Sequence, residues 1–132
     1  MVQSMKSYFS EKNRNGEMEE NMNYNKGNFY ELEWEDVRPG VSRKLYTGEG
    51  ATLTVSKLMV GHEPKPHSHS YEQITAILEG EGYFHIKGEK IRMLKGDMLV
   101  IPPGSEHFFE ATGEIPVLNL DIFTPKRVDY LK

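Results

Sequence analysis

The fold of this chain is constrained most by a succession of short strand-like segments that starts at residue 29. Segments rich in β-branched and aromatic residues recur at short spacing: Tyr30–Trp34, Val41–Thr47, Ala51–Val60, Ile74–Leu78, Tyr83–Ile86, Ile91–Leu94, Met98–Ile101, His107–Ala111 and Val117–Phe123. The sequence Lys87-Gly88-Glu89-Lys90 is typical of a two-residue hairpin in which the glycine takes a positive φ. No window shows a sustained 3.6-residue periodicity flanked by helix caps. The pattern predicts an all-β sandwich or small barrel, which often holds a ligand or metal in its mouth.

Composition fits one compact domain, residues 29–132, preceded by an arm, residues 1–28. The arm is rich in asparagine and lacks helical or strand periodicity, so we expect it to be mobile. No apolar run has the length of a membrane-spanning segment or the pattern of a targeting sequence.

The net charge of −4 belongs to residues 29–132, because the four acidic and four basic residues of the arm cancel. A mildly acidic domain without a basic stripe argues against nucleic acid and anionic membranes as partners. The chain has no cysteine, which excludes a disulfide framework, a thiolate metal site and a cysteine nucleophile. This absence also suits a cytoplasmic protein.

Three histidines and a glutamine form a candidate metal site. His67 and His69 point to the same face of an extended segment, because strand side chains alternate with a period of two. Gln73 shares that face if the strand continues, and His107 comes from a different strand. Three imidazoles and one amide oxygen suit a divalent transition metal, and Ni, Zn, Fe, Mn and Co all accept such a set. The alternative is a set of surface or hydrogen-bonded histidines.

Two motifs of this chain resemble those of the cupins. The first keeps the spacing of the cupin pattern Gly-x5-His-x-His-x3-Glu-x6-Gly at Gly61, His67, His69, Gln73 and Gly80. The second follows Gly-x5-Pro-x-Gly-x2-His-x3-Asn at Gly96, Pro102, Gly104, His107 and Ala111. The resemblance implies a double-stranded β-helix over the predicted strands and a homodimer. We expect Gly80, Gly96 and Gly104 at turns that need positive φ or close backbone approach.

The chain departs from the cupin motifs at two positions. Ala111 replaces an asparagine that is usually not a ligand. Gln73 replaces an acid, so a divalent site keeps its full formal charge of +2 and attracts an anionic substrate more strongly. Glu72 is the alternative ligand, but its strand parity points it away from His67 and His69. We therefore expect Gln73 to be the fourth ligand.

The segment around the histidine pair and the C-terminal strand together resemble the small pectin-degradation cupins of the KdgF type. The segments that carry this resemblance are residues 67–74 and 121–130. Proteins of that type convert unsaturated uronates to open-chain keto acids. The resemblance implies that Asp121, Phe123 and Arg127 face the metal pocket.

The residues themselves allow both functional and structural roles for these three positions. Asp121 and Phe123 share strand parity, and Asp121 beside a +2 metal could act as a general acid/base. Arg127 offers a two-pronged donor for a substrate carboxylate. The alternatives are an edge or turn residue for Asp121, a core residue for Phe123 and a solvated side chain for Arg127. We expect His62 and His85 to lie outside the ligand set and to be partly exposed.

Three classes of function remain open. The sequence favours a metal-dependent isomerase-type enzyme that acts on a small anionic sugar acid by proton transfer. The second class is an iron-dependent dioxygenase, since three histidines and a glutamine leave coordination positions open for oxygen. The third is a non-catalytic cupin that binds a small molecule or sugar. An acid/base residue beside the metal distinguishes the first class from the third.

Overall fold

The computed structural model describes residues 24–130, which form nine strands and two short 3-10 helices. The helices are η1 (Phe29–Glu31) and η2 (Val128–Tyr130). The strands are β1 (Glu35–Arg38), β2 (Val41–Thr47), β3 (Thr52–Leu58), β4 (Glu72–Glu79), β5 (Glu81–Ile86), β6 (Glu89–Met93), β7 (Met98–Ile101), β8 (His107–Thr112) and β9 (Val117–Thr124). Within residues 24–130 no helix is long and apolar enough to cross a membrane.

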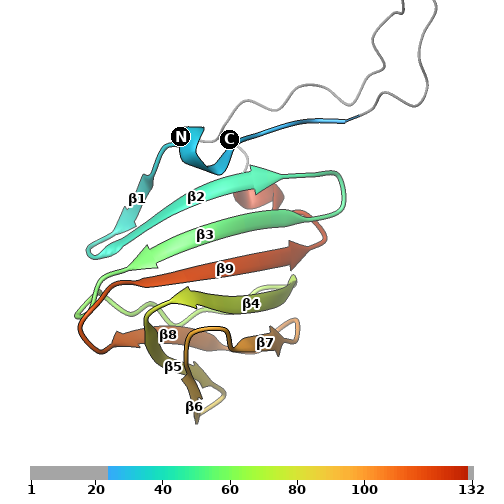
Figure 1. Cartoon of the computed structure of the whole chain (residues 1–132). Coiled ribbons are helices and arrows are strands. Elements are labelled where there is room, and N and C mark those ends of the chain that lie inside the picture. The colour runs from blue at the N-terminus through green and yellow to red at the C-terminus, as the bar shows by residue number, and fades with distance from the viewer. Residues whose placement is uncertain (1–23, 131–132) are drawn as a thin grey trace, which may run out of the picture.

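The strands form two antiparallel sheets (Figure 1). One sheet has the order β1-β2-β3-β9-β4-β7, and the other has the order β6-β5-β8. β9, the last strand, therefore lies between β3 and β4, and its pairing with both brings the C-terminal strand to the centre of the larger sheet. This topology confirms the predicted all-β fold and is that of a double-stranded β-helix.

The strand predictions agree closely with the structure except at the N-terminal end. Val41–Thr47 and Met98–Ile101 are strands with the predicted bounds. The predicted strand Tyr30–Trp34 is wrong: η1 begins there, and the first strand starts only at Glu35. The Asn28 side chain caps η1 by accepting a hydrogen bond from the backbone N–H of Tyr30 (2.8 Å), which favours a turn over an extended chain. Most of the predicted arm, residues 1–23, lies outside the described residues.

The tight turns form where the glycines were expected. Ile86 pairs with Glu89, so Lys87 (φ 47°) and Gly88 (φ 83°) are the two turn residues of the predicted hairpin. Gly80 between β4 and β5 has φ 81° and lies so close to the chain after β8 that a Cβ there would be 2.8 Å from the Pro116 carbonyl oxygen.

The inner face of β9 divides the interior into an apolar half and a polar half. Its buried residues alternate as Val117, Asn119, Asp121 and Phe123. At the Val117 end the interior is a hydrophobic core that also contains Ile77, Phe84 and Ile101. Burial of these side chains stabilises the fold, at about 25 cal/mol per Å² of apolar surface. The polar end holds the candidate site.

Candidate metal centre

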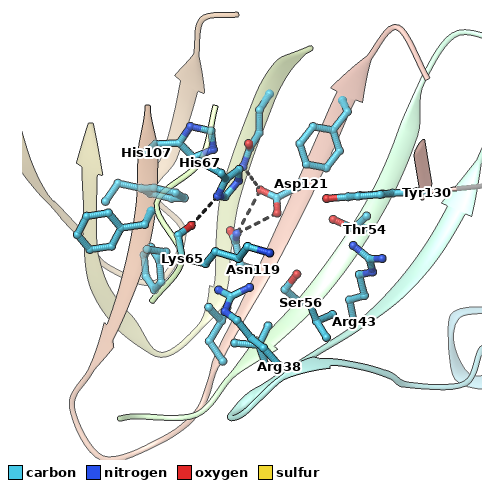
Figure 2. A pocket seen from close by; sticks show the side chains of 18 residues that line it. Arg38, Arg43, Thr54, Ser56, Lys65, His67, His107, Asn119, Asp121 and Tyr130 are labelled. Atoms are coloured by element: carbon cyan, nitrogen blue, oxygen red, sulfur yellow. Dashed lines mark hydrogen bonds between the residues drawn. The ribbon is translucent and has the colours of Figure 1, made fainter. Parts of the chain in front are cut away.

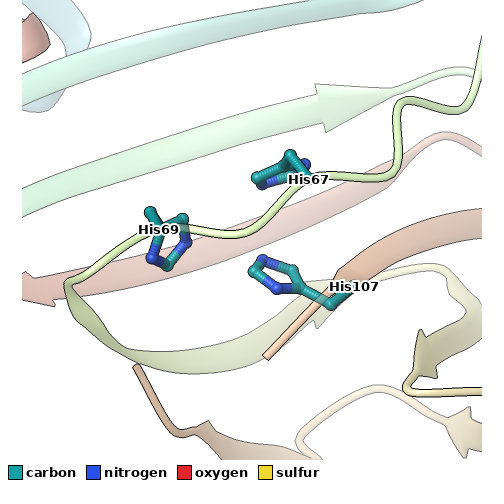
Figure 3. Close-up of side chains that lie close together, drawn as sticks. All are labelled: His67, His69 and His107. Atoms are coloured by element: carbon teal, nitrogen blue, oxygen red, sulfur yellow. The ribbon is translucent and has the colours of Figure 1, made fainter. Parts of the chain in front are cut away.

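The three predicted histidine ligands converge at the polar end of the interior (Figure 3). Their nearest ring nitrogens lie within 4.8 Å of one another. His67 and His69 stand on the irregular segment that precedes β4, and His107 begins β8. Two backbone hydrogen bonds join the segments, from His67 N to His107 O (3.0 Å) and from His107 N to His67 O (2.9 Å). This single antiparallel bridge fixes the relative position of the histidines.

Backbone carbonyls select the same tautomer in all three imidazoles. The Nδ1 atoms of His67, His69 and His107 lie 2.7, 3.0 and 2.8 Å from the carbonyl oxygens of Lys65, Tyr71 and Ser105. A carbonyl only accepts hydrogen bonds, so Nδ1 carries the proton and Nε2 presents a lone pair. A carbonyl bonded to Nδ1–H is the usual support of a metal-bound histidine.

Gln73 lies beside the histidines, and a bound cation would explain the close contact between its oxygen and His69. Its Oε1 lies 3.2 Å from Nε2 of His69, and its Nε2 donates to Oδ1 of Asp121 at 2.7 Å. In the assigned tautomer both atoms of the first contact are acceptors, so they repel unless a cation lies against them. Nε2 of His107 is also buried with no hydrogen-bond partner among residues 24–130. The four side chains therefore fit a divalent transition metal, whereas Glu72 is exposed.

Burial favours the neutral, metal-binding form of two of the imidazoles. Desolvation lowers the pKa of His107 to about 4, against a smaller opposite effect of the Ser105 carbonyl. It also lowers the pKa of His67. Neutral imidazoles bind a metal without first losing a proton.

Asp121 is a buried acid in a network of polar side chains (Figure 2). Besides Gln73, it accepts hydrogen bonds from Asn119 Nδ2 at 3.1 and 3.2 Å. Desolvation by burial raises the pKa of Asp121 to about 6, while hydrogen bonds from Thr75, Gln73 and Asn119 limit the rise. An acid with a raised pKa in a cavity is a candidate proton-transfer group.

Phe123 lines the cavity beside the histidines, whereas Arg127, which was expected to face it, does not and lies against the Phe123 ring instead, with its guanidinium carbon 4.7 Å from the ring centroid. The Phe123 ring packs edge-on against His69, with centroids 5.5 Å apart. Arg127 is buried: it donates from Nε and Nη2 to Asp129 at 3.2 and 2.6 Å, and its guanidinium carbon lies 3.9 Å from the centroid of Tyr130. Its Nη1 has no hydrogen-bond partner among the described residues. Two of the three guanidinium nitrogens, Nε and Nη2, therefore already donate to Asp129, which was not expected from the sequence.

The structure adds pocket residues that the sequence reasoning missed. A cavity of about 120 Å³ is lined by His67, Gln73, His107, Asp121 and Phe123 together with Arg38, Arg43, Lys65 and Tyr130. Figure 2 shows Arg38 and Arg43 on the side of the cavity away from the histidines, whereas Lys65 lies directly beside His67. Isolated arginines and lysines have no diagnostic spacing, so no signal in the sequence marks them.

The two remaining histidines, His62 and His85, lie outside the cluster formed by His67, His69 and His107. His62, however, is buried, so the prediction of partial exposure is wrong for this residue. Its Nε2 accepts a hydrogen bond from the backbone N–H of Ala111 (3.2 Å), which is a structural role. His85 is partly exposed and stacks on Phe108, with centroids 4.3 Å apart.

A small antiparallel β-sandwich with a histidine cluster that could hold a metal ion is typical of jelly-roll proteins. The family model for the cupin domain matches residues 54–123, more than half of the chain. The chain therefore belongs to the cupin family.

Comparison with solved structures and curated sequences adds individual relatives. The structure of KdgF from Halomonas sp. superposes with a TM-score of 0.73 at 32% identity, covering 78% of this chain and 96% of that chain. Among curated sequences, an uncharacterized protein of Aquifex aeolicus is 41% identical over 61 residues, which are 46% of this chain and 50% of the relative. Acireductone dioxygenase of Yarrowia lipolytica is 28% identical over 109 residues, 72% of this chain and 63% of the relative. The chain thus spans less than two thirds of these two curated relatives.

Proposed function

We propose that this cupin is a metal-dependent isomerase-type enzyme that converts an unsaturated uronate, or a related small sugar acid, to an open-chain keto acid. The observation that carries the proposal is the hydrogen bond between Gln73 and Asp121, which joins a candidate ligand to a buried acid in one cavity. A binding module needs no acid at this position. The likeness to KdgF over nearly the whole of that chain supports the same substrate class.

The proposed reaction moves protons and breaks one bond without adding or losing atoms. The Asp121 carboxylate takes the proton from the hydroxyl on the anomeric carbon, and the bond from that carbon to the ring oxygen breaks. Delivery of a proton to the enol carbon then gives the keto acid. The metal, when bound by His67, His69, Gln73 and His107, supplies Lewis-acid stabilisation of negative charge on oxygen.

Two further residues position the substrate in this proposal. Arg127 lines the pocket beside the metal cavity and supplies positive charge for the substrate carboxylate, while its Nε and Nη2 bind Asp129 and its Nη1 is buried. Phe123 packs against the His69 ring and closes the apolar side of the cavity, which keeps water from the reacting atoms.

The test is incubation of the metal-loaded protein with a 4,5-unsaturated galacturonate, followed by loss of ultraviolet absorbance. We expect turnover, and a decrease of about 100-fold or more in kcat for Asp121→Asn with unchanged metal content. The matched control is Asp36→Asn. Asp36 is an exposed acid on β1, and it lines neither the cavity beside the histidines nor the larger cavity next to it. Absence of turnover with every one of Ni, Zn, Fe, Mn and Co would contradict the proposal.

A second candidate function is oxidative cleavage with iron as the metal. The match to acireductone dioxygenase over 72% of this chain supports it, and three imidazoles with an amide oxygen leave room for oxygen at iron. Oxygen uptake by the iron-loaded protein in the same assay would favour this function. Ligand binding without any reaction would favour the non-catalytic alternative.

We also propose that the chain is a homodimer. The outer face of the larger sheet carries exposed apolar side chains on adjacent strands, and these include Ile74 (39% exposed), Met98 (75%) and Val100 (54%). Exposed apolar patches on a β-sheet commonly mark an interface.

A further inference from the structure

A second cavity opens beside the metal cavity, and its walls are rich in cations. This outer cavity has a volume of about 550 Å³ and shares Arg38, Arg43, Lys65, His67 and Tyr130 with the metal cavity. Arg127 also lines the outer cavity. Pockets that enclose small ligands typically have volumes of about 300–1,000 Å³. The metal cavity, about 120 Å³, is smaller than this, so a sugar acid bound there extends into the outer cavity.

Arg38 is fixed at the junction of the two cavities. Its Nε donates to the carbonyl oxygen of Glu63 at 2.7 Å, which ties β1 to the segment that leads to the histidine pair. This bond uses one of the donor groups of the guanidinium and leaves both Nη groups for a ligand. Burial lowers the pKa of Arg38, and the nearby Glu63 carboxylate only partly opposes this effect. The guanidinium is therefore partly desolvated, and none of the ion pairs among residues 24–130 includes it.

Lys65 lies on the same wall and is tied to the metal site through its backbone. Its carbonyl oxygen accepts the hydrogen bond from His67 Nδ1 (2.7 Å), while its side chain is exposed and lines both cavities. Figure 2 shows the Lys65 side chain, next to His67, extending toward the same space as the Arg38 guanidinium.

The remaining charges at the outer cavity leave a positive excess. Arg43 donates from Nε to Glu35 at 2.8 Å, and Arg127 pairs with Asp129. Among residues 24–130, the outer cavity is lined by one acid, Glu63, and by four cations. The ion pairs of the described residues include neither Arg38 nor Lys65.

We propose that Arg38 and Lys65 form a second anion-binding subsite, so that among small sugar acids this protein binds those with a second anionic group more tightly than a simple uronate. One group lies at the metal and Arg127, and the other, a second carboxylate or a phosphate, lies between Arg38 and Lys65. This inference rests on the proposed function for the first group only. Two anionic positions on one ligand give selectivity, because a ligand that lacks the second group leaves the partly buried Arg38 without an anionic partner.

The experiment is isothermal titration calorimetry on the metal-loaded protein with four probes: galactose, galacturonate, galactarate and 6-phosphogluconate. We expect galactarate and 6-phosphogluconate, the probes with two anionic groups (called dianions below), to bind about tenfold or more tightly than galacturonate. This is the usual effect of one additional charge-assisted hydrogen bond. Arg38→Gln and Lys65→Gln each weaken binding of the dianions by about tenfold and change the Kd of galacturonate by less than about threefold. Metal content, measured for each variant, remains that of the wild type.

The matched control is Lys95→Gln, because Lys95 is an exposed cation paired with Glu79 and lines neither cavity. Tighter binding of 6-phosphogluconate alone supports a phosphate subsite, and tighter binding of both dianions supports a subsite for either group. Equal affinity for galacturonate and the dianions, or equal weakening of all anions by Arg38→Gln, would overturn the inference. Selective binding of the dianions without turnover of the uronate would contradict the proposed function but support the subsite. Turnover of the uronate without selective binding of the dianions would support the proposed function but contradict the subsite.

Discussion

Gln73 is the residue that joins the metal ligands to the acid. Its amide has two different ends: the oxygen faces His69 and the nitrogen donates to Asp121. A glutamate has only acceptors when ionised, so it would satisfy the metal but not Asp121. The cupin motif has an acid where this chain has Gln73. The contact with Asp121 therefore explains the glutamine as much as the charge of the site does.

Replacement of this amide tests the argument. In Gln73→Glu we expect the metal content to be retained, because a carboxylate also binds divalent metals. Turnover of the uronate should fall by about tenfold or more, because Asp121 loses a donor and faces a second negative charge. The measurement is kcat/KM together with metal analysis, and Glu72→Gln is the control at an exposed neighbouring position. Wild-type turnover in Gln73→Glu would show that the Asp121 contact does not matter.

At the scale of the elements, the sequence predicted the site better than it predicted the segments that carry it. The period-two argument assumed that His67 and His69 stand on a strand, but they stand on an irregular segment held by one bridge to His107. Their convergence was predicted correctly because the motif spacing fixes where that segment meets β8. Local sequence patterns do not show which distant segments lie side by side. The hydrogen bond from Arg38 to the Glu63 carbonyl was therefore not predicted.

The β4–β5 turn depends on a conformation that only glycine adopts without strain. We expect Gly80→Ala to lower the free energy of unfolding by about 1–3 kcal/mol, because φ is 81° and the new Cβ meets the Pro116 carbonyl. Urea unfolding measures this change. Gly50→Ala is the control, since no atom lies within 4 Å of a Cβ at that position. Equal stability of the two variants would mean that the turn relaxes without cost.

The C-terminal helix η2 is held by the pair between Arg127 and Asp129, and this pair gives a pH dependence. The hydrogen bond from Arg127 lowers the pKa of Asp129. Because the folded pKa is below the unfolded value of about 3.9, the stabilisation is fully present above about pH 4 and is lost as the pH falls through the folded pKa. Asp129→Asn should therefore be less stable than the wild type at pH 7, and the difference should shrink at pH 3.

Urea midpoints at both pH values measure this effect. Glu114→Gln, at an exposed position, is the control and should give no difference at either pH. A difference between wild type and Asp129→Asn that is the same at pH 7 and pH 3 would rule out the ion pair as its cause.

At the scale of the whole molecule, the larger sheet has one outer face that is covered in part by the chain itself. Over β2, Lys44 donates from Nζ to the Phe29 carbonyl (2.9 Å) and lies against the rings of Phe29 and Trp34. The face continues across β9, β4 and β7, where Ile122 pairs with Ile74 and Ile74 pairs with Val100. Because these side chains alternate with the buried ones, the same pattern that builds the core produces an apolar outer surface.

We expect this outer surface to be the homodimer interface. Val100→Glu places a charge beside Ile74 on the outer face, and burial of an unpaired carboxylate in an interface is unfavourable. Sedimentation equilibrium should give twice the chain mass for the wild type and the chain mass for Val100→Glu. Ile115→Glu, at an exposed apolar position outside the strands (53% exposed), should remain dimeric. A dimeric Val100→Glu variant would place the interface elsewhere, and retention of its bound metal separates loss of the dimer from loss of the fold, because the ligands come from β4, β8 and the segment before β4.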